Sequence, residues 1–219
     1  MILTVGVLIV AVLFFALLIV VSPLLYKRRI GVKYSFKNMF PFELNYKSVL
    51  KENFYTYLFL SLFVMASVGL FATFDRTYQN GFHIFSMISG IICALLIVAL
   101  FIVPLTNLRM HVIFVSLFFT LNFASSASIL VSAWKSNQEY LAPLKIVCIV
   151  IGIIILIAGF ITIVNPRMTL NIRAEEKVNE NGEKVLMRPK WVVLALTEWL
   201  HIILFIINMI NITILTFAL

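Results

Sequence analysis

Six long runs of apolar residues, separated by short polar connections, constrain what this chain can fold into. A helix needs about 20 mostly apolar residues to cross the hydrocarbon core of a bilayer. Six runs satisfy this requirement: residues 3–26, 54–74, 84–103, 112–134, 144–164 and 191–217. We therefore expect an all-α integral membrane protein, a bundle of about six transmembrane helices. Residues 1–219 then form a single transmembrane domain, and prolines such as Pro23 lie at or near span ends.

The composition agrees with this class. Hydrophobic residues make up 63% of the chain and charged residues 12%, whereas about a quarter of the residues of a soluble domain are charged. The net charge of +8 raises the possibility of a nucleic-acid partner. However, most basic residues lie in short connections between apolar runs, a pattern that indicates membrane topology and attraction to lipid. We expect no nucleic-acid partner.

The distribution of Lys and Arg predicts the orientation. Fourteen of the 17 basic residues lie in the connections at 27–53, 104–111 and 165–190. The positive-inside rule places these loops in the cytoplasm and both termini outside. Trp134 and Trp191 fall at predicted span ends, where aromatic residues anchor helices at the interface. This charge bias suits a bacterial cytoplasmic membrane.

Small residues recur every four positions in two of the predicted spans. These residues are Ser86, Gly90 and Ala94 in the third span and Ala124, Ser128 and Ser132 in the fourth. Helices in membranes associate through such small residues because they allow close packing. We interpret both sets as helix-packing seams. The alternative is a solvated pathway lined by the serines.

The first cytoplasmic loop alternates basic and aromatic residues. Its lysines at positions 33, 37, 47 and 51 are interleaved with Tyr34, Phe36 and Phe40. We expect Lys33, Lys37, Lys47 and Lys51 to face an anionic cytoplasmic leaflet, with the rings at headgroup level. A short amphipathic helix is predicted before the second span. The alternative is a basic segment that serves only as a topology signal.

The loop at 165–190 has a different pattern. Asn181-Gly182 is a strong hairpin signal, so we predict a small cytosolic β-hairpin. An isolated two-stranded hairpin is marginally stable in water and would need a partner, for which Lys177, Lys184 and Arg188 are the basic contact candidates. A flexible charged loop is the alternative.

One acidic residue, Glu198, lies within a predicted span. On a helix, Glu198, His201, Asn208 and Asn211 share one side, and a polar stripe should face the bundle interior or a wet cavity. The cluster has two interpretations: a site for a proton or a cationic group, or a structural hydrogen-bond cluster that includes Asn122. His83 and His111 begin spans on opposite sides of the membrane, so we interpret both as interfacial residues.

No catalytic motif is recognisable. Glu198 and His201 have the Glu-x-x-His spacing of di-iron bundles, but such sites need a second copy and two more glutamates. We therefore expect no enzyme activity, no metal and no cofactor. The favoured hypothesis is an accessory, regulatory or immunity-like component that contacts another membrane protein or a second copy of itself. The alternative is a small transporter or substrate-binding subunit built around Glu198 and His201.

Overall fold

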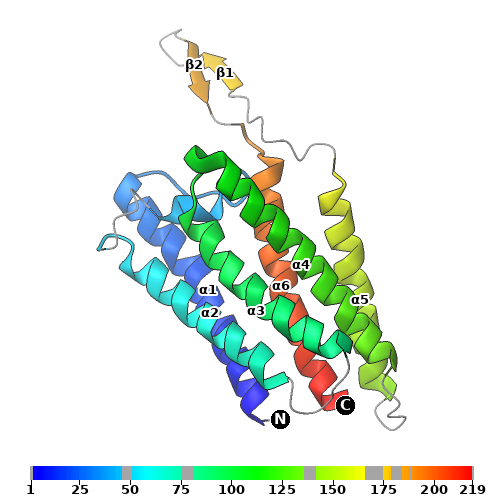
Figure 1. Ribbon diagram of the computed structural model, residues 1–219. Helices are drawn as coiled ribbons and strands as arrows, with labels where there is room; N and C mark the ends of the chain where they lie inside the picture. The colour runs from blue at the N-terminus through cyan, green and yellow to red at the C-terminus, as the bar shows by residue number, and fades with distance from the viewer. Residues whose placement is uncertain are drawn as a thin grey trace.

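The computed structural model describes residues 2–45, 51–74, 81–135, 142–165, 175–178, 184–187 and 189–218. Within these residues, six helices are long and apolar enough to cross a membrane. They are α1 (Ile2–Ile30), α2 (Phe54–Phe74), α3 (Gly81–Ile102), α4 (Leu108–Lys135), α5 (Ala142–Ile163) and α6 (Val193–Ala218) (Figure 1). Two single-turn helices, η1 (Pro41–Leu44) and η3 (Leu105–Asn107), lie in the connections. The chain is thus a multi-pass membrane protein.

The observed helices match the predicted spans to within four residues at each end. The largest differences are at the start of α4, which begins at Leu108, and at the end of α1. The span was predicted to end at residue 26, near Pro23, but α1 continues through Pro23 to Ile30. The helix therefore extends beyond the predicted span. A proline removes only one backbone donor and crowds the preceding turn, and a long membrane helix can accommodate both effects. The extra turn carries Lys27, Arg28 and Arg29 on helical backbone.

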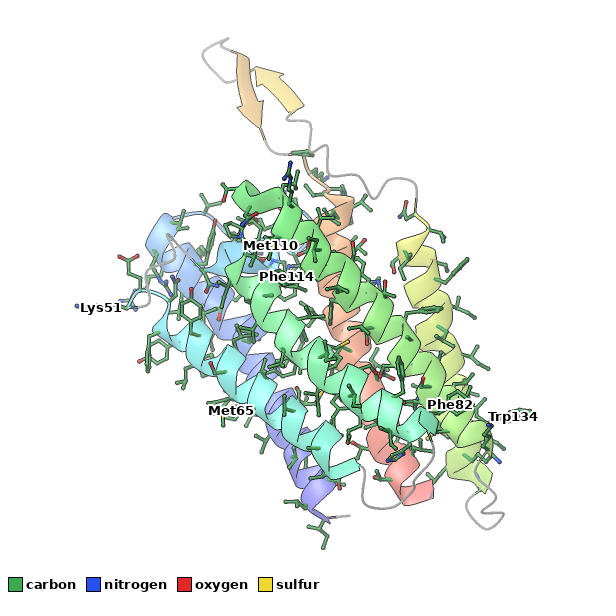
Figure 2. All side chains as sticks on the ribbon, in the orientation of Figure 1. Lys51, Met65, Phe82, Met110, Phe114 and Trp134 are labelled. Carbon is green, nitrogen blue, oxygen red and sulfur yellow. The ribbon has the colours of Figure 1, made fainter. Side chains whose placement is uncertain are left out.

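The last helix lies in the middle of the bundle. Helices α1 to α5 pack in sequence order, each against the next, and α6 packs against α1, α2, α4 and α5 (Figure 1). Its buried side chains include Phe205, which stacks on Phe71 of α2 at 5.7 Å between ring centroids. The polar residues of α6 are therefore placed inside protein, and the apolar faces of the outer helices are left to lipid. Met65 of α2, for example, projects outward and is 70% exposed (Figure 2).

The helices have a basic end, defined here as the end where α1, α3 and α5 finish and α2, α4 and α6 begin. Residues 31–45, which we call the cap loop, fold over this end. Tyr34 and Phe40 of the cap loop are buried, being 4% and 0% exposed. The loop is tied to the residue before α6, because Val192 N–H donates to Lys37 O at 2.9 Å. It is tied to α3 by Asn45, whose side-chain amide donates to Phe101 O.

The cap loop corrects one expectation. Its rings were predicted to lie at headgroup level on the leaflet, but Tyr34 and Phe40 pack into the protein instead. The helix ends beneath the loop are apolar, and the rings bury their surface by packing against them. This packing competes with the preference of aromatic side chains for the membrane interface. Lys33 and Lys37 remain exposed. The amphipathic helix predicted around Tyr46 to Leu50 lies outside the described residues.

Two short strands follow α5. Strand β1 (Glu175–Val178) pairs antiparallel with β2 (Lys184–Met187), with Glu175 opposite Met187 and Val178 opposite Lys184. The pair extends beyond the basic end, away from the helices (Figure 1). The predicted turn at Asn181-Gly182 lies outside the described residues.

Candidate functional site

A buried carboxyl–imidazole pair links α6 to α4 near the basic end. Glu198 Oε1 lies 2.9 Å from His111 Nε2, and both side chains are 0% exposed. The other ring nitrogen, Nδ1, lies 2.8 Å from the backbone oxygen of Val103. A carbonyl oxygen only accepts, so Nδ1 must carry a hydrogen and donate it.

This tautomer determines what lies between the two side chains. If the ring is neutral, Nε2 is an acceptor, and Glu198 must be protonated to donate to it. If the ring is an imidazolium, Nε2 donates to a carboxylate. In both forms one proton lies between Glu198 Oε1 and His111 Nε2. The pair can therefore hold a proton that moves between two atoms without any rearrangement of the helices.

His83 and His111 were both expected to be interfacial, and both are buried, at 0% exposed. The neighbours of His111 show how this residue is covered. It lies in the first turn of α4, but two cap-loop rings cover it. Phe40 and Phe42 meet the imidazole edge-on at 5.9 and 5.6 Å between ring centroids. The sequence analysis missed the pairing because Glu198 and His111 are 87 residues apart, and helix periodicity contains no information about contacts between helices.

The residue after Glu198 holds the cap loop in place. Trp199 Nε1–H lies 3.0 Å from Met39 O and 3.2 Å from the Tyr34 hydroxyl oxygen, within reach of both as acceptors. Tyr34 O–H in turn lies 2.7 Å from Phe40 O, to which it donates. Glu198 thus bonds the buried His111, and the adjacent Trp199 bonds the cap loop that covers it.

His201 forms a separate site. Its Nε2 lies 2.8 Å from Thr162 Oγ1 of α5. The Thr162 hydroxyl hydrogen is donated to Gly159 O at 2.7 Å, so the hydroxyl oxygen must accept from His201 Nε2–H. The ring also stacks on Phe119 of α4, at 3.9 Å between centroids and 15° between planes. The His201 ring therefore carries a hydrogen on Nε2, and it bonds a different helix from Glu198.

The three asparagines of the predicted cluster are also buried. Asn122 of α4 donates from Nδ2 to His201 O at 3.2 Å, which joins it to the histidine as the sequence analysis proposed for one interpretation. Asn208 and Asn211 are 0% exposed. Within the described part of the chain, several buried polar atoms of this cluster have no hydrogen-bond partner: Glu198 Oε2, His201 Nδ1, Asn122 Oδ1, and both amide atoms of Asn208 and Asn211.

Unpaired buried polar atoms are costly, at about 1–3 kcal/mol each. In native proteins such atoms are usually satisfied by ordered water. The unpaired atoms here follow α6 from Glu198 to Asn211. Chemically, the cluster offers hydrogen-bonding atoms to water, a proton or a small polar group along the centre of the bundle.

The first small-residue set lies in buried positions on α3. Ser86, Gly90 and Ala94 are all buried. The ring of Phe71 from α2 rests directly on Gly90, and a Cβ atom at this position would overlap the ring. Ser86 also faces α4, because its backbone oxygen lies 3.5 Å from Ser125 Oγ. Gly90 therefore allows a close approach of α2 that a larger residue would prevent.

The second set lies on α4. Ser128 and Ser132 are buried, at 8% and 0% exposed, and Ala124 is half-buried. The sequence analysis missed a comparable pair of glycines on α5. Leu130 of α4 packs over Gly152, and a Cβ on Gly159 would lie 3.3 Å from the ring of Phe123. Their seven-residue spacing, which keeps both on one helix face, was the available signal.

The basic residues chosen from the sequence are spread over the basic end. Lys33 and Lys37 lie on the cap loop, and Lys51 precedes α2 with its side chain exposed. Lys37 Nζ lies 4.6 Å from the ring centroid of Trp191. Lys177 lies on β1 and Lys184 on β2, whereas Lys47 and Arg188 lie outside the described residues.

Comparison with known proteins found no matching family model, no matching curated protein and no matching solved structure. The buried cluster, the cap loop and the strand pair are therefore the features of this protein that bear on its function.

Proposed function

We propose that this protein is a non-catalytic accessory, regulatory or immunity-like component that acts by contacting another membrane protein. The observation that carries the proposal is the strand pair β1–β2, which extends beyond the basic end of the bundle (Figure 1). Each strand is four residues long. Two strands of this length are marginally stable alone in water, so a second surface would stabilise them.

The outer edges of the strand pair support this role. Within the described residues the sheet has two strands, so each strand pairs along one edge only. The free edge of each strand presents N–H and C=O groups that an extended segment of another protein can pair with. Lys177 and Lys184 place basic residues on the two strands, one on each. Strand β1 also carries Glu175 and Glu176, so a partner segment with both acidic and basic side chains would match the pair.

The orientation is part of the same proposal. The positive-inside rule places the basic end, with its cap loop and strand pair, on the cytoplasmic side, and both termini outside. In a bacterial cytoplasmic membrane this arrangement would present the strands to cytosolic segments of the partner. The anionic leaflet would lie beside Lys27, Arg28 and Arg29 at the end of α1.

Charge reversal on the strands tests the proposal. We expect the protein, purified from its native membrane in mild detergent, to carry a stoichiometric partner identified by mass spectrometry. The Lys177→Glu/Lys184→Glu variant should lose that partner. The matched control, Lys51→Glu/Arg109→Glu, makes the same change of charge at exposed residues of the same end and should keep it. A wild-type preparation without a partner, or equal loss in both variants, would contradict the proposal.

A small transporter is the second candidate, and the buried Glu198–His111 pair favours it. A proton held between two side chains inside a membrane is typical of proton-coupled transport. Both side chains are fully buried, so a substrate could reach them only if the cap loop moved.

A conservative substitution separates the two candidates. Glu198→Gln keeps the size of the side chain and can still donate to a neutral His111 ring, but it cannot exchange a proton. Loss of function with unchanged abundance and unchanged stability would favour transport. Retained function, or loss of function only in proportion to abundance, would favour a structural role for the pair.

A further inference from the structure

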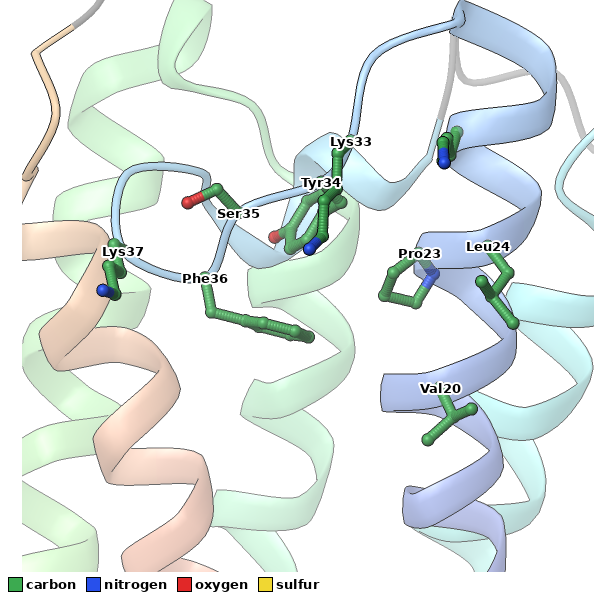
Figure 3. A pocket seen from close by; sticks show the side chains of 9 residues that line it. Val20, Pro23, Leu24, Lys33, Tyr34, Ser35, Phe36 and Lys37 are labelled. Atoms are coloured by element: carbon green, nitrogen blue, oxygen red, sulfur yellow. The ribbon is translucent and has the colours of Figure 1, made fainter.

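A groove of about 750 Å³ lies between α1 and the cap loop, at the basic end (Figure 3). This volume is typical of ligand pockets, which range from about 300 to 1,000 Å³. Its walls are formed by two segments, the last turns of α1 and the first half of the cap loop. The groove is separate from the Glu198–His111 pair, because neither residue lines it.

The lower part of the groove is apolar. On the α1 side it is formed by Val20, Pro23 and Leu24, and Val20 and Leu24 are 57% and 63% exposed. The opposite wall is Phe36, which reaches from the cap loop toward α1 (Figure 3). The exposure of Val20 and Leu24 places them on the outer surface of the bundle, where hydrocarbon chains lie.

The position of Phe36 is determined by its neighbours inside the protein. Its ring meets Trp199 edge-on at 4.8 Å and Tyr34 edge-on at 5.2 Å between centroids. Tyr34 and Trp199 are themselves buried and hydrogen-bonded to the cap-loop backbone. The apolar wall is therefore formed before any ligand arrives, which lowers the entropic cost of binding.

The rim of the groove is basic. Lys27, Lys33 and Lys37 line it, and no acidic residue does. Among the described residues, none of the three lysines forms an ion pair. Lys37 is engaged over the Trp191 ring, and its side chain points away from α1 (Figure 3). The positive charges available to an anion beside α1 are therefore those of Lys27 and Lys33.

The apolar wall and the basic rim are stacked along the membrane normal. Val20 and Lys27 are separated by seven residues of helix, a rise of roughly 10 Å. Along α1 toward the basic end, the apolar side chains therefore precede the positive charge by about 10 Å. A phospholipid has the same order of polarity, with its acyl chains inside and its phosphate at the interface.

We propose that this groove binds one anionic phospholipid of the leaflet at the basic end. The phosphate would be held by Lys27 and Lys33, and the upper part of an acyl chain would lie between Leu24 and Phe36. The charge complementarity and the polarity order distinguish this occupant from an apolar protein helix, which would leave both lysines beside it without counterions. The site goes beyond the proposed contact with a partner, because it needs only the lipid.

Lipid retention by the purified full-length protein tests the proposal. The protein is exchanged into mild detergent with added phosphatidylglycerol or phosphatidylcholine, and bound lipid is measured by native mass spectrometry. We expect one retained phosphatidylglycerol per chain and weak retention of phosphatidylcholine. Lys27→Gln/Lys33→Gln should weaken phosphatidylglycerol binding about thirtyfold, the effect of removing two juxtamembrane charges. The control Lys51→Gln/Lys190→Gln removes two exposed charges outside the groove and should have little effect.

A second pair of variants tests the apolar wall without a change of charge. Leu24→Trp fills the groove from its exposed side and should also abolish specific retention. The control Leu13→Trp introduces the same ring at another exposed position of α1 and should not. Equal retention of both lipids, equal losses in a variant and its control, or a co-purified peptide that competes with lipid for the groove would each overturn the proposal.

Discussion

The Glu198–His111 pair predicts strong thermodynamic coupling between two helices that are far apart in the sequence. Glu198→Leu leaves His111 Nε2 without its partner at 2.9 Å, in a site that is 0% exposed. Removing one member of a buried pair costs about 3–5 kcal/mol. His111→Leu has a similar cost, and it also removes the donor to Val103 O. The double variant leaves no unpaired carboxyl or imidazole, so it should cost at least about 2 kcal/mol less than the sum of the two single variants.

The measurement is a double-mutant cycle on the free energy of unfolding. The purified protein in mild detergent is titrated with SDS, and helix content is followed by circular dichroism. A control cycle pairs Glu198→Leu with Ser132→Ala, a residue on α4 that is 21 positions, roughly 30 Å, beyond His111. The control should be additive. If the Glu198–His111 cycle were also additive within about 0.5 kcal/mol, the pair would not hold α4 to α6.

Two further predictions concern packing and the cap loop. Gly90→Ala should destabilise the protein by about 1–3 kcal/mol, because the new methyl group overlaps the Phe71 ring. The control Gly6→Ala on α1 places its methyl group where no atom lies within 4 Å, so it should not destabilise the protein. The free energy of unfolding in SDS is measured for both variants. Trp199→Phe removes the indole donor to the cap loop, which should cost about 1–2 kcal/mol and increase hydrogen exchange in residues 34–40. Trp134→Phe, at a 72% exposed position, should leave exchange there unchanged, and equal exchange in both variants would contradict the role given to Trp199.

The helices could be predicted from the sequence because each depends mainly on its own residues. Residues 54–74, for instance, are predicted and observed with the same bounds, since an apolar run of that length has few stable alternatives in a bilayer. The stripe on α6 was predicted for the same reason. Glu198, His201, Asn208 and Asn211 share a face by helix geometry alone, and all four are buried.

The parts of the site that depend on contacts between helices could not be predicted. The sequence shows that Glu198 needs a partner, and the structure identifies that partner as His111. His111 lies at the start of α4 and is buried only because the cap loop covers it. Similarly, Thr162 was not considered, although it bonds His201 from α5. In both cases the decisive information is which helices are neighbours, and a single sequence contains no direct record of that.

The central position of α6 has a consequence for the order of synthesis. Chains fold from the N-terminal side as they are made, and α6 is the last of the six described helices to leave the ribosome. Until it arrives, His111 and Asn122 on α4 have neither Glu198 nor the His201 backbone to bond. Until α6 is inserted, helices α1 to α5 must therefore exist in the membrane as an incomplete bundle with unpaired polar groups on its inner face. Insertion of α6 completes the polar interior and, through Trp199, anchors a cap loop that was synthesised about 160 residues earlier.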